Sequence, residues 1–239
     1  MTLPVFVTIV TIQCVTRDAL LAAQLLPQAE WLGAAPALAP RLLEEGHLRR
    51  LAAGQWVQAE GDEETGLMAV IDGMLDLYCQ TPGDRVLLFH RIGAGTAIGQ
   101  TIAFGGGPRL VTAIAARASL ILAVPDRALA RIARDEPEIR TLMASLLFNQ
   151  LGVALQIAAQ AIALPPRQRI AARLLLLSEG GDLAADLPLS QAALAEMTGL
   201  SRKTVNAHLS ALARAGAIAL GHGRLTIRDR GRLRAISEA

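Results

Sequence analysis

The chain has 239 residues, which is enough for two compact domains, each with its own hydrophobic core. It has only two cysteines, Cys14 and Cys79, far apart and without a C-x-x-C spacing, which excludes a disulfide framework and a zinc site of that type. The net charge of +2 hides an asymmetry: residues 164–239 carry eleven basic and six acidic side chains, whereas residues 1–163 carry twelve and fifteen. Positive charge therefore collects at the C-terminal end, as attraction to phosphates requires.

The N-terminal segment, residues 1–24, begins with an uncharged apolar run over residues 2–16. This run is too short to span a bilayer, and no basic residue precedes it as in a secretory signal. An extra strand, an ill-ordered tail and an artefact of the start site all remain open. We expect a soluble, cytoplasmic protein with reduced thiols and no membrane partner.

Residues 25–125 are predicted to form an antiparallel β jelly-roll barrel. Between residues 42 and 124, short runs rich in Val, Ile, Leu and aromatic residues alternate with Gly and Pro turns, a pattern typical of such barrels. The predicted strands are QWVQ, LMAVID, MLDLYC, VLLFHRI, LVTAIAA and LILAV.

Residues 126–163 are predicted to be helical, with a short helix followed by a long one over residues 138–163. Pro137 suits a first helical turn, and Pro165 and Pro166 stop the long helix, which would extend about 40 Å at 1.5 Å per residue. Its apolar residues cover too wide an arc for one contact, so it needs two partners. The barrel and the same helix of a second subunit are one solution. Burial wholly inside one chain is the alternative.

The C-terminal region, residues 164–239, contains a predicted helix–turn–helix over residues 187–218. Ser190 and Ser201 are placed to cap the two helices, and Gly199 allows the tight turn between them. Apolar residues of both helices should close a small core. The polar residues expected to face outward on the second helix are Arg202, Lys203, Thr204, Asn206 and His208. Such a helix suits a DNA major groove, although a solvated helical hairpin is the plainer alternative.

Two short strands are predicted after the second helix, at residues 217–220 and 224–227, joined by a Gly-His-Gly turn. A β-hairpin at this place makes a winged helix–turn–helix. The wing would bring His222 and Arg224 near the phosphate backbone.

The order of these parts resembles the CRP/FNR family of bacterial transcription regulators. The resemblance rests on LMAVIDGMLDLY and AIGQTIAFGGGPRLVTAIAA in the barrel, on LPPRQRIAARLL at the hinge, and most specifically on SRKTV in the second helix. It implies an α+β fold with a barrel that senses a small effector, a long dimerisation helix and a winged helix–turn–helix. It also implies a homodimer that binds double-stranded DNA and acts with RNA polymerase.

Carrying over the residues by which family members bind cAMP gives a mixed result. Gly99-Gln100 stands where the family has Gly-Glu, and Arg109-Leu110 where it has Arg-Ser. Arg109 would keep the anion-binding group, and a helix beginning near Thr101 could lend its amides. Leu110, however, removes a hydroxyl that donates to phosphate.

The long helix departs from the family as well. Ala154 and Leu155 stand where cAMP-binding members have a Thr-Ser pair that meets adenine. Each lost polar contact costs about 1 to 1.5 kcal/mol, so three losses weaken binding by roughly two to three orders of magnitude. We expect cAMP in its standard pose to bind weakly. Another ligand, a different nucleotide pose or no ligand remain open.

The sequence gives little support for the other cofactors of the family, an iron–sulfur centre and haem. An iron–sulfur centre needs four thiolates, which two cysteines cannot supply. A haem ligand could be sought among His47, His90 and Cys79, but a lone histidine in a strand is more often a packed or surface residue. We expect neither cofactor, and no metal site.

The second helix also departs from the family's Ser-Arg-Glu-Thr-Val pattern. Arg202 and Thr204 match, but Lys203 replaces an acidic residue that accepts a hydrogen bond from cytosine, and Asn206-Ala207 stands where cAMP-binding members have Gly-Arg. A lysine prefers guanine or phosphate, so the half-site of those members should not be transferred.

We do not expect an enzyme. Asp72, Asp76 and Asp84 lie at turn or strand positions without a paired His or Ser signature, and the chain has no phosphate-binding G-x-x-x-x-G-K motif. A module that binds a cyclic nucleotide or another small ligand without binding promoters is the alternative function.

Overall fold

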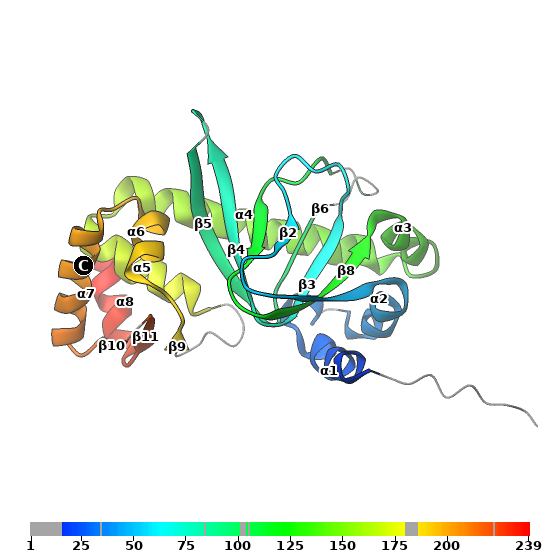
Figure 1. Cartoon of the computed structure of the whole chain (residues 1–239), viewed down its shortest axis with the longest axis horizontal. Helices are drawn as coiled ribbons and strands as arrows, with labels where there is room; N and C mark the ends of the chain where they lie inside the picture. The colour runs from blue at the N-terminus through cyan, green and yellow to red at the C-terminus, as the bar shows by residue number, and fades with distance from the viewer. Residues whose placement is uncertain are drawn as a thin grey trace, which may run out of the picture.

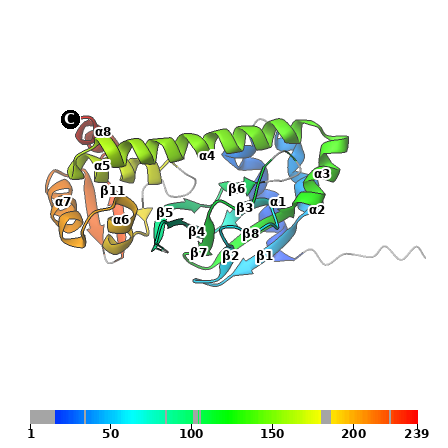
Figure 2. The ribbon, with the colours of Figure 1, turned by 90° about the horizontal axis from the view of Figure 1, so that it is seen from above.

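The computed structural model describes residues 16–33, 35–83, 85–100, 104, 106–179, 186–221 and 223–239, without the side chains of Gln100 and Asp186. The expectations for residues 2–15, Asp84, Thr101 and His222 therefore lie outside the described part of the chain. A β-rich domain and a smaller C-terminal domain lie side by side along one long helix (Figure 1). Figure 2 shows this helix, α4, running along both of them.

Two four-stranded antiparallel sheets form the N-terminal domain, with the orders β1-β8-β3-β6 and β2-β7-β4-β5. The strands are β1 (His47–Leu51), β2 (Trp56–Gln58), β3 (Gly66–Asp72), β4 (Met74–Thr81), β5 (Arg85–Gly93), β6 (Ala97–Gln100), β7 (Thr112–Ala115) and β8 (Ser119–Pro125). The predicted antiparallel jelly roll is confirmed. Strands β1 and β6, one at each edge of the same sheet, were not predicted from the sequence.

Helices and a small sheet make up the rest of the described chain. The helices are α1 (Arg17–Leu25), α2 (Ala39–Glu45), α3 (Asp126–Asp135), α4 (Glu138–Ala163), α5 (Pro166–Leu177), α6 (Gln191–Thr198), α7 (Arg202–Arg214) and α8 (Arg230–Glu238), with 3-10 turns at Leu26–Gln28, Glu30–Leu32 and Pro36–Leu38. The sheet, ordered β10-β11-β9, consists of β9 (Asp186–Leu187), β10 (Ile218–Gly221) and β11 (Arg224–Ile227).

The first helix packs into the core of the barrel domain. Thr16 caps α1 by accepting a hydrogen bond from the amide of Ala19, and the side chain of Ala22 is fully buried. Ala22 belongs to the same apolar cluster as Leu67 and Leu122 of the barrel sheet. The boundary predicted after residue 24 therefore cuts through a helix that packs against the barrel, because helical burial there depends on contacts distant in the sequence.

The long helix α4 has two opposite apolar faces. Its bounds, Glu138–Ala163, match the prediction from the flanking prolines. One face packs on the barrel domain through Ile139, Leu142, Met143 and Leu146, with Ile157 buried farther along. The other face carries an exposed stripe, defined as Phe148, Leu151, Leu155 and Ile162, whose residues are 55–86% exposed. Burial of the helix wholly inside one chain, the alternative raised from the sequence, is therefore wrong.

By length and composition alone, α4 is also apolar enough to cross a membrane, with a mean hydropathy of 1.5 over its best 18-residue window. One face of α4 is buried against the barrel, so some of the apolar side chains that raise its hydropathy already pack inside the chain. What remains is a narrow stripe rather than an apolar surface on all sides.

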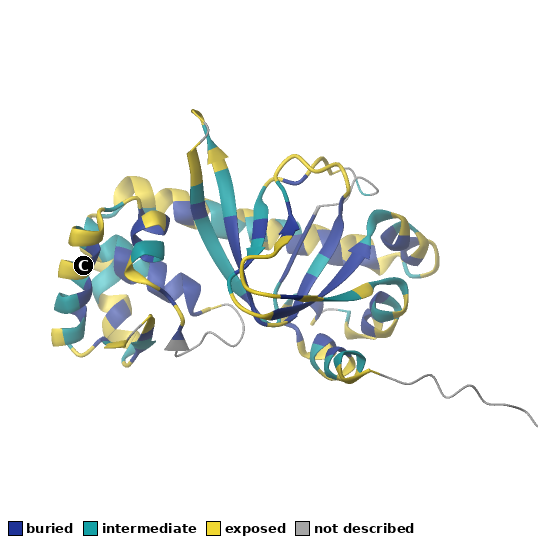
Figure 3. Ribbon diagram, in the orientation of Figure 1, coloured by how far each residue is buried: buried dark blue, intermediate teal, exposed yellow. Residues whose placement is uncertain are grey.

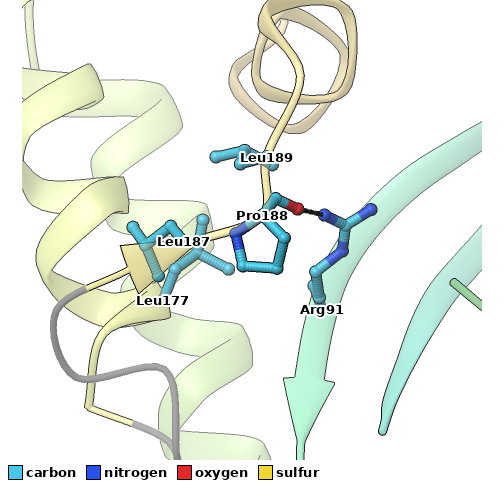
Figure 4. A pocket seen from close by; sticks show the side chains of 5 residues that line it. All are labelled: Arg91, Leu177, Leu187, Pro188 and Leu189. Atoms are coloured by element: carbon cyan, nitrogen blue, oxygen red, sulfur yellow. Dashed lines mark hydrogen bonds between the residues drawn. The ribbon is translucent and has the colours of Figure 1, made fainter. Parts of the chain in front are cut away.

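Strand β5 joins the barrel to the C-terminal domain. Arg91 pairs with Asp76 of β4 at Nε–Oδ1 2.5 Å and donates to the carbonyl of Pro188 in the C-terminal domain (Figure 4). The side chain of Glu196 on α6 accepts from the amide of Leu88 at 2.7 Å. The buried Arg173 of α5 donates to the carbonyl of Phe89 at 3.2 Å. Helices α5 and α6 and the connection between β9 and α6 are thus all tied to one strand.

Replacing Arg91 by alanine should destabilise the fold by about 3 kcal/mol. Both side chains of the pair are only 12% exposed, so the variant leaves the Asp76 carboxylate buried without its counter-charge. Arg117→Ala is the matched control, because Arg117 and Asp72 are 3.9 Å apart with side chains 51% and 60% exposed, and its loss should stay below about 0.5 kcal/mol. Urea unfolding followed by circular dichroism measures both. Equal small losses would contradict the prediction.

Candidate DNA-binding surface and effector cavity

The helix pair α6–α7 has the predicted geometry. Ser190 accepts from the amide of Ala193 and Ser201 from that of Thr204, both at 3.1 Å, so each serine caps its helix. Gly199 adopts the left-handed conformation, with φ 65°, that the tight turn requires. Of the residues predicted to close the core, Leu200 is only partly buried. The others are buried: Leu194, Ala195, Thr198, Val205, Leu209 and Leu212.

The outer face of α7 is polar. Arg202, Lys203 and Asn206 are exposed, while Thr204 and His208 are partly buried. Two of these side chains have partners: the hydroxyl of Thr204 lies 2.8 Å from that of Ser201, and the amide oxygen of Asn206 accepts from Gln191 at 3.4 Å. Among the described residues, the side chains of Arg202 and Lys203 have no hydrogen-bond or ion-pair partner, so two exposed positive charges lie in the first turn of the helix.

The hairpin after α7 is present, with β10 paired antiparallel to β11 from Ile218 opposite Ile227 to Gly221 opposite Arg224. Strand β10 begins one residue later than predicted. The third strand, β9, pairs with β11 and was missed, because two residues carry no periodic pattern. Arg224 is exposed at the start of β11, next to the turn, as a phosphate contact would need.

A cavity of about 750 Å³ lies between the barrel, α4 and the C-terminal domain. Strands β5 and β6 line its barrel side, residues 146–154 of α4 line a second side, and Leu176, Leu177 and Glu179 line the end toward the C-terminal domain. Gly99, Leu110 and Ala154, three of the predicted ligand residues, are among the lining residues. Trp31 and Gln58, which the sequence did not point to, also line the cavity, as does His90, which the sequence offered only as a haem ligand.

The structure corrects the expectation for Arg109. This side chain is 2% exposed and does not line the cavity. Its Nε donates to the carbonyl of Glu64 at 3.2 Å and a terminal nitrogen donates to that of Gly66 at 2.7 Å. Burial lowers the pKa of the guanidinium, with Asp126 and Asp62 opposing that effect. Arg109 therefore fastens a loop to β3 in this structure rather than presenting an anion site.

Of the predicted ligand residues Ala154 and Leu155, only one lines the cavity. Ala154 lines the cavity, whereas Leu155 does not and is 61% exposed in the stripe, of which Leu151 also lines the cavity. Adjacent helical residues point about 100° apart, so both cannot meet one ligand in the same way. Of the other residues predicted to bind cAMP, the side chain of Gln100 and all of Thr101 lie outside the described part of the chain.

The haem candidates lie on two different sheets, although Cys79 and His90 are on paired strands of the same one. His47 starts β1 and Cys79 is half-buried on β4, whereas His90 lies on β5 in the other sheet from His47. Burial, with a contribution from Arg173, lowers the pKa of His90 to about 4. Among the residues that the structure describes, no group of three or more His, Cys, Asp or Glu side chains could hold a metal ion.

Two family models match the chain. Residues 48–136 match the cyclic nucleotide-binding domain, and residues 168–236 match the Crp-like helix-turn-helix domain. The first match covers the barrel strands from β1 to α3, and the second runs from α5 into α8.

Relatives share both parts. A CRP-like cAMP-activated global transcriptional regulator of Mycobacterium tuberculosis is 30% identical over 186 residues, which are 75% of this chain and 83% of that protein. The nitrogen fixation regulation protein FixK of Bradyrhizobium diazoefficiens is 26% identical, over 84% of this chain and 87% of its own. The solved structure of FixK2 from Bradyrhizobium japonicum, 20% identical, has the same fold with a TM-score of 0.71 and covers 81% of this chain and 98% of that one.

The winged helix–turn–helix is thus joined to a cyclic-nucleotide-binding-type barrel by one long helix, and both the family models and a relative that aligns over most of its length agree on this combination. The chain belongs to the CRP/FNR family of DNA-binding transcription regulators.

Proposed function

We propose that this regulator works in the cytoplasm as a homodimer, that it reads DNA with the first turn of α7, and that its cavity does not serve cAMP in the family's standard pose. The observation that carries the proposal is the exposed, cationic start of α7. Arg202 and Lys203 are exposed above a buried row of Val205, Leu209 and Leu212, which fixes the helix with its polar side outward. We expect no catalytic activity, and we expect RNA polymerase as a partner, as in the family.

Dimerisation is supported by the stripe on α4. Phe148, Leu151, Leu155 and Ile162 follow spacings of three, four and seven residues, which is the heptad spacing of a two-stranded coiled coil. A two-fold seam along α4 would bury these side chains and pair the two α7 helices. Paired reading helices fit half-sites about one DNA turn, roughly 34 Å, apart.

The case against cAMP rests on the charge around the cavity. Among its described lining residues, Arg91 is the only Arg or Lys, and it is already paired with Asp76 and with the carbonyl of Pro188. Arg109, the family's phosphate ligand, is bonded to two main-chain carbonyls. A cyclic phosphate would therefore lose its hydration without meeting a free counter-charge.

Arg202→Ala should weaken binding to a duplex selected from a random library by about 1 to 3 kcal/mol and relax the preference at one base pair, because a base contact is lost. Arg224→Ala should instead weaken binding to all sequences and lower the salt slope by about 1, because a phosphate contact is lost. Fluorescence anisotropy on selected and random duplexes at several salt concentrations measures both. Equal losses on the two duplexes for Arg202→Ala would overturn its role as a base reader.

Replacing both Leu151 and Leu155 by glutamate should turn the dimer into a monomer, because four carboxylates would meet at the seam. Light scattering after size-exclusion chromatography measures the mass, and affinity for a two-half-site duplex should fall at least about 100-fold with loss of the second reading helix. Gln156→Glu is the control, since Gln156 is exposed on the flank of α4, away from the stripe. A double variant that remains dimeric would refute the seam.

Adding 1 mM cAMP should stabilise the protein by less than about 0.5 kcal/mol, as expected when Kd exceeds about 1 mM. Thermal unfolding with and without the nucleotide measures this, with AMP at the same concentration as the control for phosphate charge. A stabilisation above about 1 kcal/mol by cAMP alone would contradict this part of the proposal.

A further inference from the structure

We propose that Gln191 and Asn206 together read one adenine in the major groove, with Asn206 in contact with the base and Gln191 as its positioning residue. This inference rests on the proposed function, in which the first turn of α7 enters the groove. Three observations support it: the place of Asn206 on the surface of α7, a hydrogen bond that joins the two amide side chains, and the small residue beside Asn206.

Asn206 lies on the same side of α7 as the two exposed cations of the first turn. It follows Arg202 by four residues and Lys203 by three, and residues at these spacings are neighbours on a helix surface. All three side chains are exposed, whereas Val205 and Leu209 are buried and fix the helix on the core of the domain. When the first turn of α7 enters the groove, Asn206 therefore comes within reach of the base edges one turn farther along.

A hydrogen bond between α6 and α7, which lie side by side at the end of the molecule away from the barrel (Figure 1), holds the amide of Asn206. Gln191 is the first residue of α6, and its Nε2 donates to Oδ1 of Asn206 at 3.4 Å. Helix α6 is itself held in place, because Leu194 and Ala195 are buried and Ser190 caps its start. The amide of a free asparagine side chain can turn over and exchange its oxygen and nitrogen. The donor of Gln191 favours one of these two orientations, so the amide is arranged before DNA binds.

The remaining groups of this amide match adenine. Oδ1 keeps its second lone pair and Nδ2 keeps both hydrogens, so Asn206 can accept one hydrogen bond from a base and donate another to it. Adenine presents the complementary pair in the major groove, an N6 donor beside the N7 acceptor. Guanine presents two acceptors there, so the amide oxygen would face O6 with no hydrogen between them. A matched pair of bonds discriminates against a wrong base by about 5- to 150-fold.

The residue after Asn206 allows the close approach that a short side chain needs. Ala207 is exposed and carries only a methyl group, so the side chain at this position does not hold the helix away from the bases. The methyl group of an alanine can also contact the methyl group of the thymine that pairs with adenine. Asn206 and Ala207 together therefore suit an adenine–thymine base pair.

Base analogues test the two bonds separately. A duplex is selected from a random library with the unchanged protein, and each adenine of its half-site is replaced in turn by 7-deazaadenine, which lacks the N7 acceptor, or by purine, which lacks the N6 amino group. At one adenine, each replacement should weaken binding, measured by fluorescence anisotropy, by about two- to tenfold. The same replacements should have no effect on Asn206→Ala, because that variant makes neither bond. A half-site without such an adenine, or equal effects on both proteins, would overturn the inference.

Gln191→Met tests the positioning role, since methionine has a similar length and no donor. It should weaken binding to the selected duplex by about two- to tenfold and reduce the effect of both analogues. Combined with Asn206→Ala it should add no further loss, because Gln191 acts through Asn206. Gln24→Met, the same change at an exposed position on α1, is the control and should leave affinity unchanged. Fully additive losses would give Gln191 a DNA contact of its own and refute the positioning role.

Two further variants separate this inference from the proposed function. Arg224→Ala should lower affinity but leave the relative effects of the two analogues unchanged, because a phosphate contact carries no base preference. If Arg202→Ala relaxes a base preference and Asn206→Ala does not, the adenine contact is wrong while the regulator assignment stands. If the protein selects no duplex at all, the DNA-reading role fails, and this inference fails with it. Both Gln191 and Asn206 are exposed, so melting curves of their variants should match that of the unchanged protein.

Discussion

The fold depends on one constraint: helix α4 has apolar side chains on two opposite faces, and one domain can cover only one of them. The barrel covers Ile139, Leu142 and Leu146. The stripe from Phe148 to Ile162 stays exposed in the single chain, and about 25 cal/mol per Å² favours covering it. The same helix ends at Ala163, and α5, the first helix of the C-terminal domain, begins at Pro166. In the proposed dimer, the helix that forms the seam is therefore also the helix that leads into the DNA-binding domain.

Strand β5 provides a second link between the two domains. Its main chain contacts Arg173 and Glu196, and its Arg91 holds the carbonyl of Pro188. Glu196 lies on α6, which packs against the reading helix through the shared core of Leu194 and Leu209. The orientation of α7 is thus set both by α4 through the chain and by β5 through hydrogen bonds. Figure 3 shows buried residues on the barrel strands and on the helices of the C-terminal domain, with β5 between them largely half-buried.

Local patterns predicted the helix–turn–helix, the wing and the bounds of α4, because caps, a left-handed glycine and flanking prolines act over a few residues. The features that were missed depend on distant contacts. Strands β1 and β6 owe their place to partners in β8 and β3, and the burial of Arg109 depends on carbonyls more than 40 residues earlier in the chain. Family resemblance transferred the residue type at that position, but not the direction of its side chain.

The cavity and the link between domains meet at the same strand. His90 and Arg91 line the cavity, and their neighbours Leu88 and Phe89 contact α6 and α5. A molecule in the cavity would therefore touch a strand that also holds the reading domain, as well as Leu176 and Leu177 of α5 directly. A ligand changes the balance between two conformations only by the difference in its affinity for them. Since this wall comes from both domains, any change in their relative position changes the contacts of the ligand, and binding and DNA reading must then be coupled in both directions.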